Sequence, residues 1–355
     1  MRKSIAIHGA VYGRNFGDII IIETVLKSLA RSGHCDVSIP MGFSRFIDYI
    51  NRGSNVVGRN RYPSVIIFGP GGYLGQPRYN TLRWNIRFMM YHGFIILASF
   101  LFRIPVVIHG TGVGPATFHP VRLLMKLLFM RAERIHVRDV ESSNYVKELY
   151  KGVNEDILTF GGDVALALPH FYGIEPIDIN HVAGVIGIHM PVGDKIGFPD
   201  ELADDLLTFV AKHNECKFNI LHDGPAQEVH SKLKGLLSFE HVSNFKFEGP
   251  EELISQINQC ELIITTKLHV GICAYALGKK IISTYTHPKN KRFFQQIERR
   301  DNSVFIEDYQ PGWLSGMVAK TLADCEFHEK LNELSSQVKV DLGGLIRVVE
   351  KINGN

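Results

Sequence analysis

Residues 261–285 read ELIITTKLHVGICAYALGKKIISTY. The stretch begins with a β-branched run, continues through a helix-like series of small apolar residues that ends near Gly278, and closes with a second β-branched run. Two continuously apolar strands joined by a helix are typical of a βαβ unit, in which both strands lie parallel in one sheet. This stretch therefore predicts a parallel α/β sheet.

The same alternation of strand-like runs and helical patterns recurs along the chain of 355 residues. Strands are expected at 4–9, 64–72, 105–112, 134–139, 156–163, 183–191, 217–224, 244–249, 261–266 and 279–285. Helices are expected between them, for example at 201–213 and 251–260. Two such series predict an α/β protein with two Rossmann-like domains whose parallel sheets face each other across a cleft, and ligands of such sheets bind beyond the carboxyl ends of the strands.

Changes in this pattern predict the domain boundaries. The first Rossmann-like domain is expected at 1–170, a linker at 171–182, the second domain at 183–322, and a tail at 323–355 that is helical but interrupted by Gly343 and Gly344. A chain of this length is too long for one ordinary domain and suits two.

Charge is distributed unevenly between the two halves. Residues 1–170 hold 20 Lys and Arg against 11 Asp and Glu, whereas residues 171–355 hold 19 against 25. A basic half suits an anionic membrane, a polyphosphate or a nucleic acid, but it can equally be a solvated surface.

The most apolar run, MMYHGFIILASFLF at 89–102, is too short and too interrupted to span a bilayer. It is either a helix of the protein core or, with Arg83, Arg87 and Arg103 beside it, a contact with a membrane surface. Arg122, Lys126 and Arg131 on the next predicted helix keep the second interpretation open.

The cysteines and the N-terminus indicate a cytoplasmic protein. The five cysteines are scattered and show no CxxC spacing, so neither a disulfide framework nor a zinc site is expected. The first residues, MRKSIAIHGAVYGRNFGD, turn to glycine and polar residues too early for a signal peptide. The expected location is the cytoplasm, at the inner face of the plasma membrane if the basic half meets lipid.

Six histidines stand at or just after the ends of predicted strands. They are His8, His109, His189, His222, His269 and His287. Parallel strands in two facing sheets would bring them to one crevice, and histidine is the side chain that titrates near neutral pH without perturbation. The sequence has no HExxH or HxH element and few acidic residues at these ends, so no metal is expected.

Glycine-rich segments and a helix start complete the pattern. FGPGGYLGQ (68–76) and HGTGVGP (109–115) are expected to be loops that follow strands, either approaching a ligand closely or simply turning. They lack the order of a dinucleotide or P-loop fingerprint. Asn15 and Asp18 stand at the start of a predicted helix, where they either cap it or, in the case of Asp18, accept a proton from a sugar hydroxyl.

Together these segments resemble the polysaccharide pyruvyl transferase family. NFGD (15–18) is similar to its N-x-G-D element, GPGGYLG and GTGVGP to its glycine loops, VRDVESSNYVKEL (137–149) to its R-D-x-x-S helix, GGDVAL (161–166) to its aspartate before an apolar pair, and KLHVGICAYALGKKII to its R-L-H segment. The resemblance runs in order from about residue 8 to 297. In this family's pattern Lys267 stands in place of an arginine, and His189 stands where an arginine is common.

The resemblance implies a GT-B-like fold and a reaction. The pyruvyl group of phosphoenolpyruvate would be transferred to two hydroxyls of a sugar in a cell-surface polysaccharide or its precursor, forming a cyclic ketal without a further cofactor. The implied catalytic residues are His269, as general acid, and Asp18. The implied donor-binding residues are Lys267, Leu268, His189 and Lys289. The implied acceptor-binding residues, in the first domain, are Asn15, Gly71, Gly72, His109 and Asp163.

Two other functions remain open. A GT-B glycosyltransferase would use a nucleotide sugar, but many such enzymes carry two glutamates in the donor site and this chain has no acidic residue between Lys267 and Glu298. A non-catalytic sugar- or lipid-binding relative is the third alternative. The expected partners are a sugar acceptor, free or lipid-linked, and an anionic membrane, and no nucleic acid.

Overall fold

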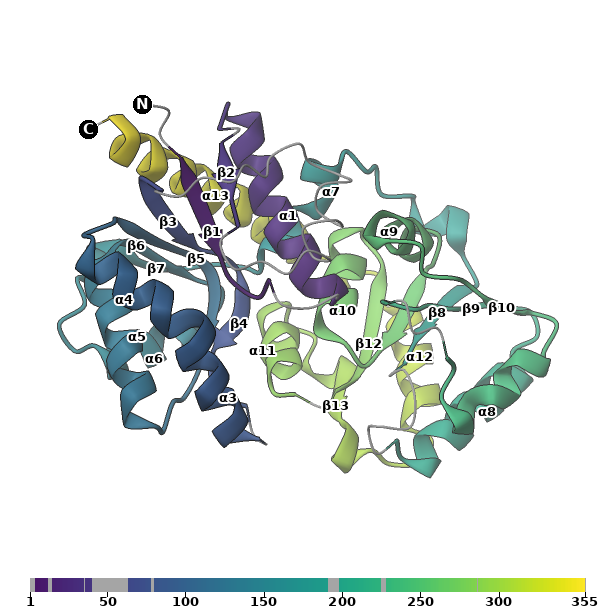
Figure 1. The fold of residues 1–355 in the computed structure, drawn as a ribbon. Helices are drawn as coiled ribbons and strands as arrows, with labels where there is room; N and C mark the ends of the chain where they lie inside the picture. Colours follow the sequence, from purple (N-terminus) through teal and green to yellow (C-terminus); the bar gives the residue numbers. More distant parts are fainter. Residues whose placement is uncertain are drawn as a thin grey trace. The chain divides into compact units, whose positions relative to one another are not determined.

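The computed structural model describes residues 4–11, 15–34, 36–39, 63–77, 80–190, 198–224, 228–285 and 287–354. The described chain forms two compact units, each built on one parallel sheet (Figure 1). Unit 1 comprises the described residues up to Ala167, except 15–17, together with those from Ser336 onward. Unit 2 comprises 15–17 and the described residues of 168–335. The expected α/β class with two parallel sheets is confirmed.

Unit 1 contains a seven-stranded sheet in the order β2-β1-β3-β5-β6-β7, with β4 beside β5. Its strands are β1 (Ile5–His8), β2 (Val37–Ser38), β3 (Val65–Phe68), β4 (Gly71–Leu74), β5 (Val106–Val113), β6 (Ala132–Val137) and β7 (Leu158–Phe160). The chain moves from β1 outward to β2 and then reverses from β3 onward. Because parallel crossovers are right-handed, this reversal places helix α1 (Phe16–Arg31) on one face and the later helices on the other.

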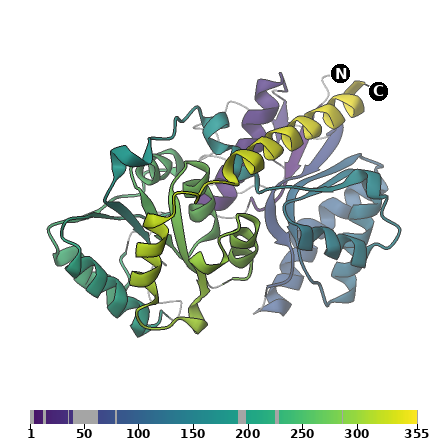
Figure 2. The same ribbon diagram turned by 180° about the vertical axis from the view of Figure 1, so that it is seen from behind.

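The later helices of unit 1 cover one face of its sheet, and α13 covers the other (Figures 1 and 2). They are α3 (Thr81–Phe88), the π-helical turn η1 (Met89–Gly93), α4 (Phe94–Leu101), α5 (His119–Arg131) and α6 (Val140–Leu149), with short 3-10 turns η2 (Glu155–Ile157) and η3 (Val164–Ala167) near β7. Phe88, Ile96 and Phe129 from these helices pack on Phe68 and Ile108 of the sheet. Apolar strands with helices on both faces are what the sequence pattern predicts.

Helix α13 (Leu331–Gly354) is continuous, so the expected interruption at Gly343 and Gly344 is wrong. The glycines serve a packing role instead. A Cβ on Gly344 would lie 2.9 Å from the guanidinium of Arg134, and Nη1 of Arg134 donates to the carbonyl of Asp341 at 2.9 Å. The absence of a side chain lets Arg134 lie against the helix backbone.

Unit 2 contains a six-stranded sheet in the order β10-β9-β8-β11-β12-β13. Its strands are β8 (Val185–His189), β9 (Lys217–Ile220), β10 (Val242–Asn244), β11 (Leu262–Thr265), β12 (Lys280–Tyr285) and β13 (Ser303–Phe305). Its α-helices are α7 (Leu168–Tyr172), α8 (Asp200–Lys212), α9 (Pro250–Asn258), α10 (Leu268–Ala276), α11 (Lys289–Gln296) and α12 (Trp313–Ala323). Short 3-10 segments are η4 (Ile179–Val182), η5 (Ser231–Ser238), η6 (Arg300–Asn302) and η7 (Ile306–Asp308).

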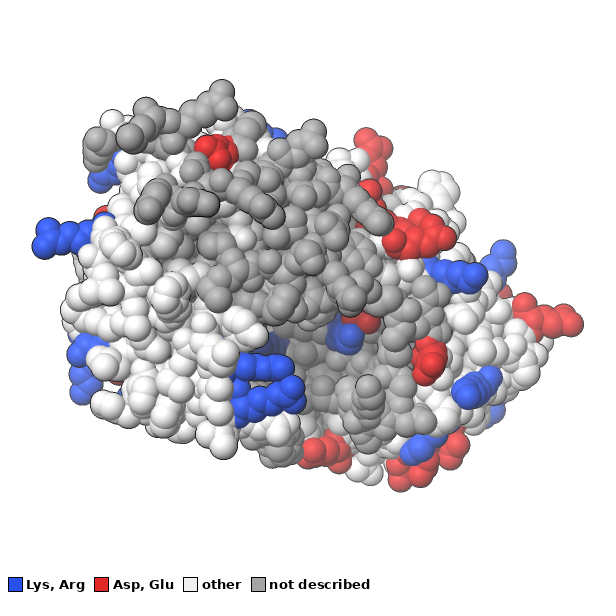
Figure 3. Space-filling model, in the orientation of Figure 1, with Lys and Arg blue, Asp and Glu red and all other residues white. Residues whose placement is uncertain are grey.

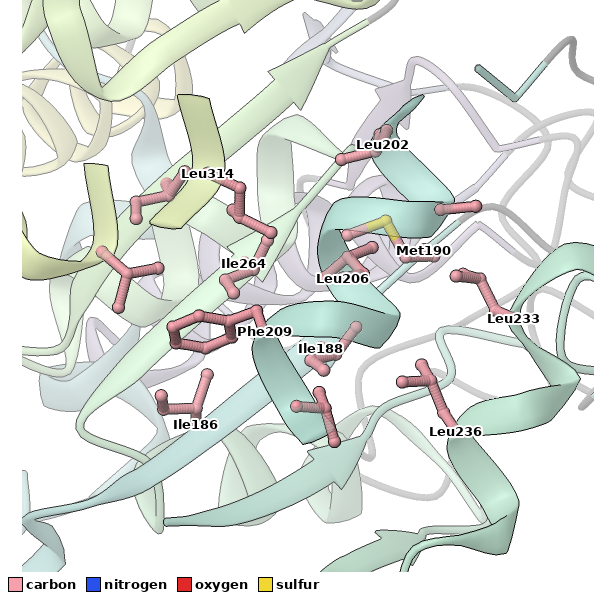
Figure 4. Packing of buried hydrophobic residues seen from close by; sticks show 14 of the residues in the cluster. Ile186, Ile188, Met190, Leu202, Leu206, Phe209, Leu233, Leu236, Ile264 and Leu314 are labelled. Carbon is pink, nitrogen blue, oxygen red and sulfur yellow. The ribbon is translucent and has the colours of Figure 1, made fainter. Parts of the chain in front are cut away.

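The core of unit 2 forms where α8 packs on the sheet (Figure 4). Leu206 and Phe209 of α8 lie against Ile186 and Ile188 of β8, and Ile264 of β11 joins the same cluster. Burial of each such side chain stabilises the fold by roughly 1.5–3 kcal/mol relative to exposure. The strands that this core holds in place are β8 and β11.

Nine of the ten predicted strands coincide with observed ones. The run 244–249 is wrong, because β10 ends at Asn244 and the chain continues without regular structure to Pro250, where α9 begins. The short strands β2 and β13 were not predicted, since two or three residues leave no periodic signal. No helix of the described chain is both long enough and apolar enough to cross a bilayer.

Candidate functional site

The strand order of unit 2 changes direction between β8 and β11. From β8 the chain proceeds to β9 and β10, and after β11 it proceeds to β12 and β13 on the opposite side. Ligands of open α/β sheets bind at such a switch point, outside the carboxyl ends of the strands. His189 ends β8 and is paired in register with Thr265, which ends β11. The predicted donor-binding residues His189 and Lys267 therefore both lie at the switch point.

A buried carboxylate, Asp223, joins these two residues. It follows β9, which neighbours β8, and its Oδ2 accepts from Nζ of Lys267 at 2.5 Å while its Oδ1 lies 3.5 Å from Nε2 of His189. The Asp223 side chain is 4% exposed, whereas that of Lys267 is 43% exposed. Burial alone would raise the pKa of Asp223, but hydrogen bonding and charge from His189 and Lys267 outweigh it and hold this pKa well below its usual range.

Thr265 connects the same group through its hydroxyl. Its Oγ1 lies 3.2 Å from Nδ1 of His189 and accepts from the backbone N–H of Lys267 at 3.0 Å. The hydroxyl thus fixes the imidazole of His189 and the backbone turn from which Lys267 projects. Because His189 and the backbone at Lys267 are already held in place, they lose little conformational entropy when a ligand binds.

Helix α10 begins directly after this turn. Lys267 is its N-cap residue in an extended conformation and supplies no side-chain hydrogen bond to the first turn, whose N–H groups have no intrahelical partner. Leu268 and His269 are the first two residues of the helix, and both are half-buried. Lys289, another predicted donor-binding residue, is half-buried at the first position of α11. A helix N-terminus beside a lysine is a favourable environment for an anion.

Gly17 packs closely against the His269 side chain within unit 2. A Cβ at Gly17 would overlap the ring, with Cγ at 2.6 Å and Cβ of His269 at 2.8 Å. Asn15, two residues earlier, accepts from the N–H of Gly17 at 3.2 Å through its Oδ1, which is a turn-stabilising role. Asp18 lies in the first turn of α1 and is half-buried. NFGD therefore combines a helix start with a glycine that makes room for His269.

The two glycine-rich segments are strands rather than loops, which corrects the expectation for them. Gly71 and Gly72 open β4, and HGTGV lies inside β5, with Gly71 paired to Thr111. Gly71 has φ of +131°, a conformation that only glycine adopts without strain, and a Cβ there would lie 3.2 Å from that of Ala10. Gly71 therefore packs closely against Ala10. Gly75, directly after β4, lies close to Gly114, directly after β5, since a Cβ on Gly75 would lie 3.0 Å from the backbone N of Gly114.

His109 and Asp163 both lie inside unit 1. His109 is fully buried in β5, its ring stacks on that of His136 at 4.7 Å, and burial holds its pKa well below the usual value, with a further lowering from His136 and Arg134. Asp163 accepts from the N–H of Ala165 at 3.1 Å and lies 3.6 Å from the guanidinium of Arg138. Both side chains serve the interior packing of unit 1.

Several other strand-end histidines are also buried. His8 at the end of β1 shares a 2.8 Å hydrogen bond with His92 of the π-helical turn, and burial lowers the pKa of His92 to about 3. His222 shares a 2.7 Å hydrogen bond with Asn244, and its pKa is lowered mainly by burial. Within the described ranges no group of three or more His, Cys, Asp or Glu has the arrangement of a metal site.

The sequence interpretation missed Asp223. The signal was present in NILHDG (219–224), where an aspartate follows a strand directly beside His222. Asp223 changes what the site can do. Nζ of Lys267 already donates a hydrogen bond to the Asp223 carboxylate. An anion that binds Lys267 must therefore share the ammonium group with Asp223.

The comparisons with known proteins agree with this architecture. A family model described as polysaccharide pyruvyl transferase matches residues 15–288. A comparison with curated proteins finds no significant match. Among solved structures, a UDP-GlcNAc 2-epimerase from Methanocaldococcus jannaschii is 12% identical with a TM-score of 0.60, covering 99% of this chain and 100% of that one.

Two further solved structures are similar in the same way. The Neisseria meningitidis UDP-GlcNAc 2-epimerase bound to UDP-GlcNAc is 14% identical with a TM-score of 0.57, covering 97% of this chain and 100% of that one. The glycotransferase of kitacinnamycin is 10% identical with a TM-score of 0.58, covering 99% and 100%. At these identities the likeness concerns the fold alone, and it bears out the expected GT-B class.

Proposed function

Because the chain belongs to the polysaccharide pyruvyl transferase family, we propose that it transfers the pyruvyl group of phosphoenolpyruvate to two hydroxyls of a sugar, forming a cyclic ketal and releasing phosphate. The observation that carries this proposal is the cationic helix start at the switch point of unit 2, where Lys267 and His269 flank the first amides of α10. Phosphoenolpyruvate carries a carboxylate and a phosphate, and both need cations or N–H donors.

The donor would be held by the residues around this helix start. Lys267 would contact one anionic group while keeping its bond to Asp223, and the amides of the first turn of α10 would receive another. Leu268 and His189 would border the same position, and Lys289 would add positive potential from the start of α11. Fixed donors of this kind stabilise developing negative charge without reorganisation.

The reaction needs one acid and two hydroxyl nucleophiles. His269, in its protonated form, would donate a proton to the methylene carbon of phosphoenolpyruvate, which becomes the methyl group. One sugar hydroxyl, losing its proton to a base such as Asp18, would add to the adjacent carbon. Attack by the second hydroxyl at the same carbon would then close the ring as phosphate leaves. Of the two hydroxyl protons, one replaces the proton that His269 gave to the methyl group and the other leaves with phosphate. Asp18 ends the reaction unprotonated.

The acceptor is proposed to be a sugar of a cell-surface polysaccharide or its precursor, free or lipid-linked, acted on in the cytoplasm. Asn15, Gly71, Gly72, His109 and Asp163 remain the predicted acceptor-binding residues by the family resemblance. The burial of His109 and Asp163 supports an indirect role for these two, through the shape of the surrounding strands. Direct contact fits the half-buried Gly72 and exposed Asn15 better.

The test is release of inorganic phosphate from phosphoenolpyruvate in the presence of free, nucleotide-linked and lipid-linked sugars. We expect release only with a matching acceptor, whose mass increases by one pyruvate less one water. His269→Ala should lower turnover by about 10²–10⁴-fold with unchanged folding, since its ring is at a helix start and not in the core. His213→Ala, a surface histidine paired with Glu215, is the matched control.

Two results would contradict the proposal. Consumption of a nucleotide sugar without phosphoenolpyruvate would identify the glycosyltransferase alternative. Sugar binding with no turnover under any donor would identify a non-catalytic relative.

A further inference from the structure

Exposed apolar side chains of this protein gather on one face of unit 1. Eleven of the sixteen large apolar side chains that are exposed in the described chain lie between residues 82 and 130. Six of them follow one another along the continuous helix formed by α3, η1 and α4, and we call these six the apolar stripe. The stripe consists of Leu82, Ile86, Met90, Phe94, Leu97 and Leu101.

The spacing keeps the stripe on one side of the helix. Steps of three and four residues return to the same face of an α-helix, and repeated steps of four slowly drift around it. The π-helical turn Met89–Gly93 has i→i+5 hydrogen bonds and therefore more residues per turn. It partly reverses the rotation of the stripe around the helix axis. The opposite side of the same helix, with Phe88, His92, Ile95 and Ile96, is buried in unit 1.

The stripe is highly exposed and continues onto neighbouring residues. Phe94 is 69% exposed and Leu101 is 73% exposed, and Phe102, directly after α4, is 76% exposed. Leu123 of α5, the helix packed beside α4, extends the apolar surface sideways. Contiguous apolar surface of this kind on a folded protein marks an interaction site.

The charged side chains that the structure describes beside the stripe are basic. Arg83, Arg87 and Arg103 are exposed beside it, and Lys126 is exposed on α5. The sequence contains no Asp or Glu between Asp48 and Glu133, although it contains ten Lys and Arg there. Figure 3 shows the visible face over α3, α4 and α5 as mostly uncharged, with basic side chains at its borders.

These features distinguish between possible occupants of the face. In a symmetric dimer the same patch would meet itself, which would bring arginines against arginines without an acidic residue in this stretch to pair with them. A bilayer that contains anionic lipid satisfies both properties at once, because its acyl region accepts the apolar side chains and its headgroups attract the arginines.

We propose that the α3–η1–α4 helix is an interfacial anchor, which lies flat on an anionic lipid bilayer with Phe94, Leu97 and Leu101 inserted at the level of the headgroups. The helix does not cross the bilayer, because its other face belongs to the core of unit 1. The proposal goes beyond pyruvyl transfer and does not depend on the identity of the donor or acceptor.

Co-sedimentation with vesicles of equal parts phosphatidylglycerol and phosphatidylcholine tests the anchor, with pure phosphatidylcholine vesicles as the neutral comparison. We expect binding to the anionic vesicles that fades at about 0.5 M NaCl, where charges are screened within a few ångströms. The triple variant Arg83→Gln/Arg87→Gln/Arg103→Gln should bind about 100-fold more weakly, because each basic residue near the surface contributes roughly fivefold.

The apolar contribution is tested separately with Phe94→Ser/Leu101→Ser, which should weaken binding at least about tenfold. The matched control is Leu237→Ser/Val340→Ser, two exposed apolar side chains outside the stripe, which should bind as the parent does. Thermal unfolding of each variant verifies that the fold is intact.

Three results would overturn the proposal. The first is no sedimentation with anionic vesicles at low salt. The second is equal binding by the Phe94/Leu101 variant and the control variant. The third is a concentration-dependent dimer that Phe94→Ser/Leu101→Ser abolishes while vesicle binding is absent, since this would show that a second copy of the chain covers the stripe.

Discussion

Nζ of Lys267 lies 2.5 Å from Oδ2 of Asp223, a carboxylate that is almost fully buried. Forty-four positions separate the two residues in the sequence, and the neighbouring strands β9, β8 and β11 bring them together. The pair orients Lys267, because its ammonium group donates a hydrogen bond to a carboxylate that is buried. The cation at the start of α10 is therefore a positioned group, and the following predictions test what depends on that.

Replacing Lys267 with methionine should impair donor binding and stability together. Loss of one charged hydrogen bond costs about 1.5–3 kcal/mol, so the KM for phosphoenolpyruvate should rise by roughly 10–150-fold. The melting temperature should also fall, because Asp223 remains buried with one partner fewer. Lys267→Arg should retain most activity. The control is Lys320→Met, which breaks an exposed ion pair with Asp301. An unchanged KM in Lys267→Met would mean that the anionic groups of phosphoenolpyruvate bind elsewhere.

The Asp223 carboxylate should make a pH-dependent contribution to stability. Its pKa is lower in the folded protein than in the unfolded chain, so the contribution is complete above the unfolded value of about 4 and is lost as the pH falls below it. We expect Asp223→Asn to lower the free energy of unfolding by about 1–2 kcal/mol at pH 7, a moderate figure because Lys267 is 43% exposed.

Urea unfolding at a series of pH values measures this difference between parent and Asp223→Asn. The difference should narrow steadily on acidification below about pH 4. Asp301→Asn, on the exposed pair with Lys320, should show no measurable change at any of these pH values. A difference for Asp223→Asn that stays constant with pH would mean that the carboxylate is not the stabilising group.

A methyl group at Gly17 should displace the His269 ring. The Cβ of Gly17→Ala would overlap the imidazole, so the ring must rotate or the start of α1 must shift. We expect kcat to fall at least about tenfold with a smaller change in KM, since misplacing a catalytic group by about 1 Å costs on the order of 100-fold.

The control for this variant is Gly316→Ala in α12, where a Cβ meets open space. That change should leave activity intact and raise stability slightly, as alanine is favoured over glycine in a helix interior by about 1 kcal/mol. If Gly17→Ala keeps the kcat of the parent, the position of the His269 ring beside Gly17 is not needed for catalysis.

Buried His92 should destabilise unit 1 in mild acid. Burial lowers its pKa to about 3, whereas the unfolded chain binds the proton near pH 6.5, so the free energy of unfolding should fall as the pH drops below that value. The slope from this group is about 1.4 kcal/mol per pH unit. His92→Leu loses the bond to His8 and should be less stable at pH 7, yet its stability should depend less on pH between 6.5 and 5. Parallel pH profiles for the two proteins would contradict this.

Much of the candidate site followed from local sequence signals. The βαβ pattern of 261–285 correctly predicts β11, α10 and β12, and the turn at Lys267 correctly predicts a helix start beside two basic side chains. The assignment of the glycine-rich segments as loops is wrong, because Gly71–Leu74 forms β4 and His109–Val113 lies inside β5. No local pattern separates a glycine that turns the chain from one that allows close packing inside a strand.

The residues by themselves determined the alternation of strands and helices, because β-branched runs and helical periodicity act between neighbours in the chain. Only the tertiary structure decided which side chains became partners. In the folded protein Asp223 is hydrogen-bonded to Lys267, and His109 is fully buried in β5. Phe94 and Leu101 remain exposed. These outcomes depend on sheet order and on which face of each element is covered, and such contacts join residues too far apart in sequence for any local pattern to record them.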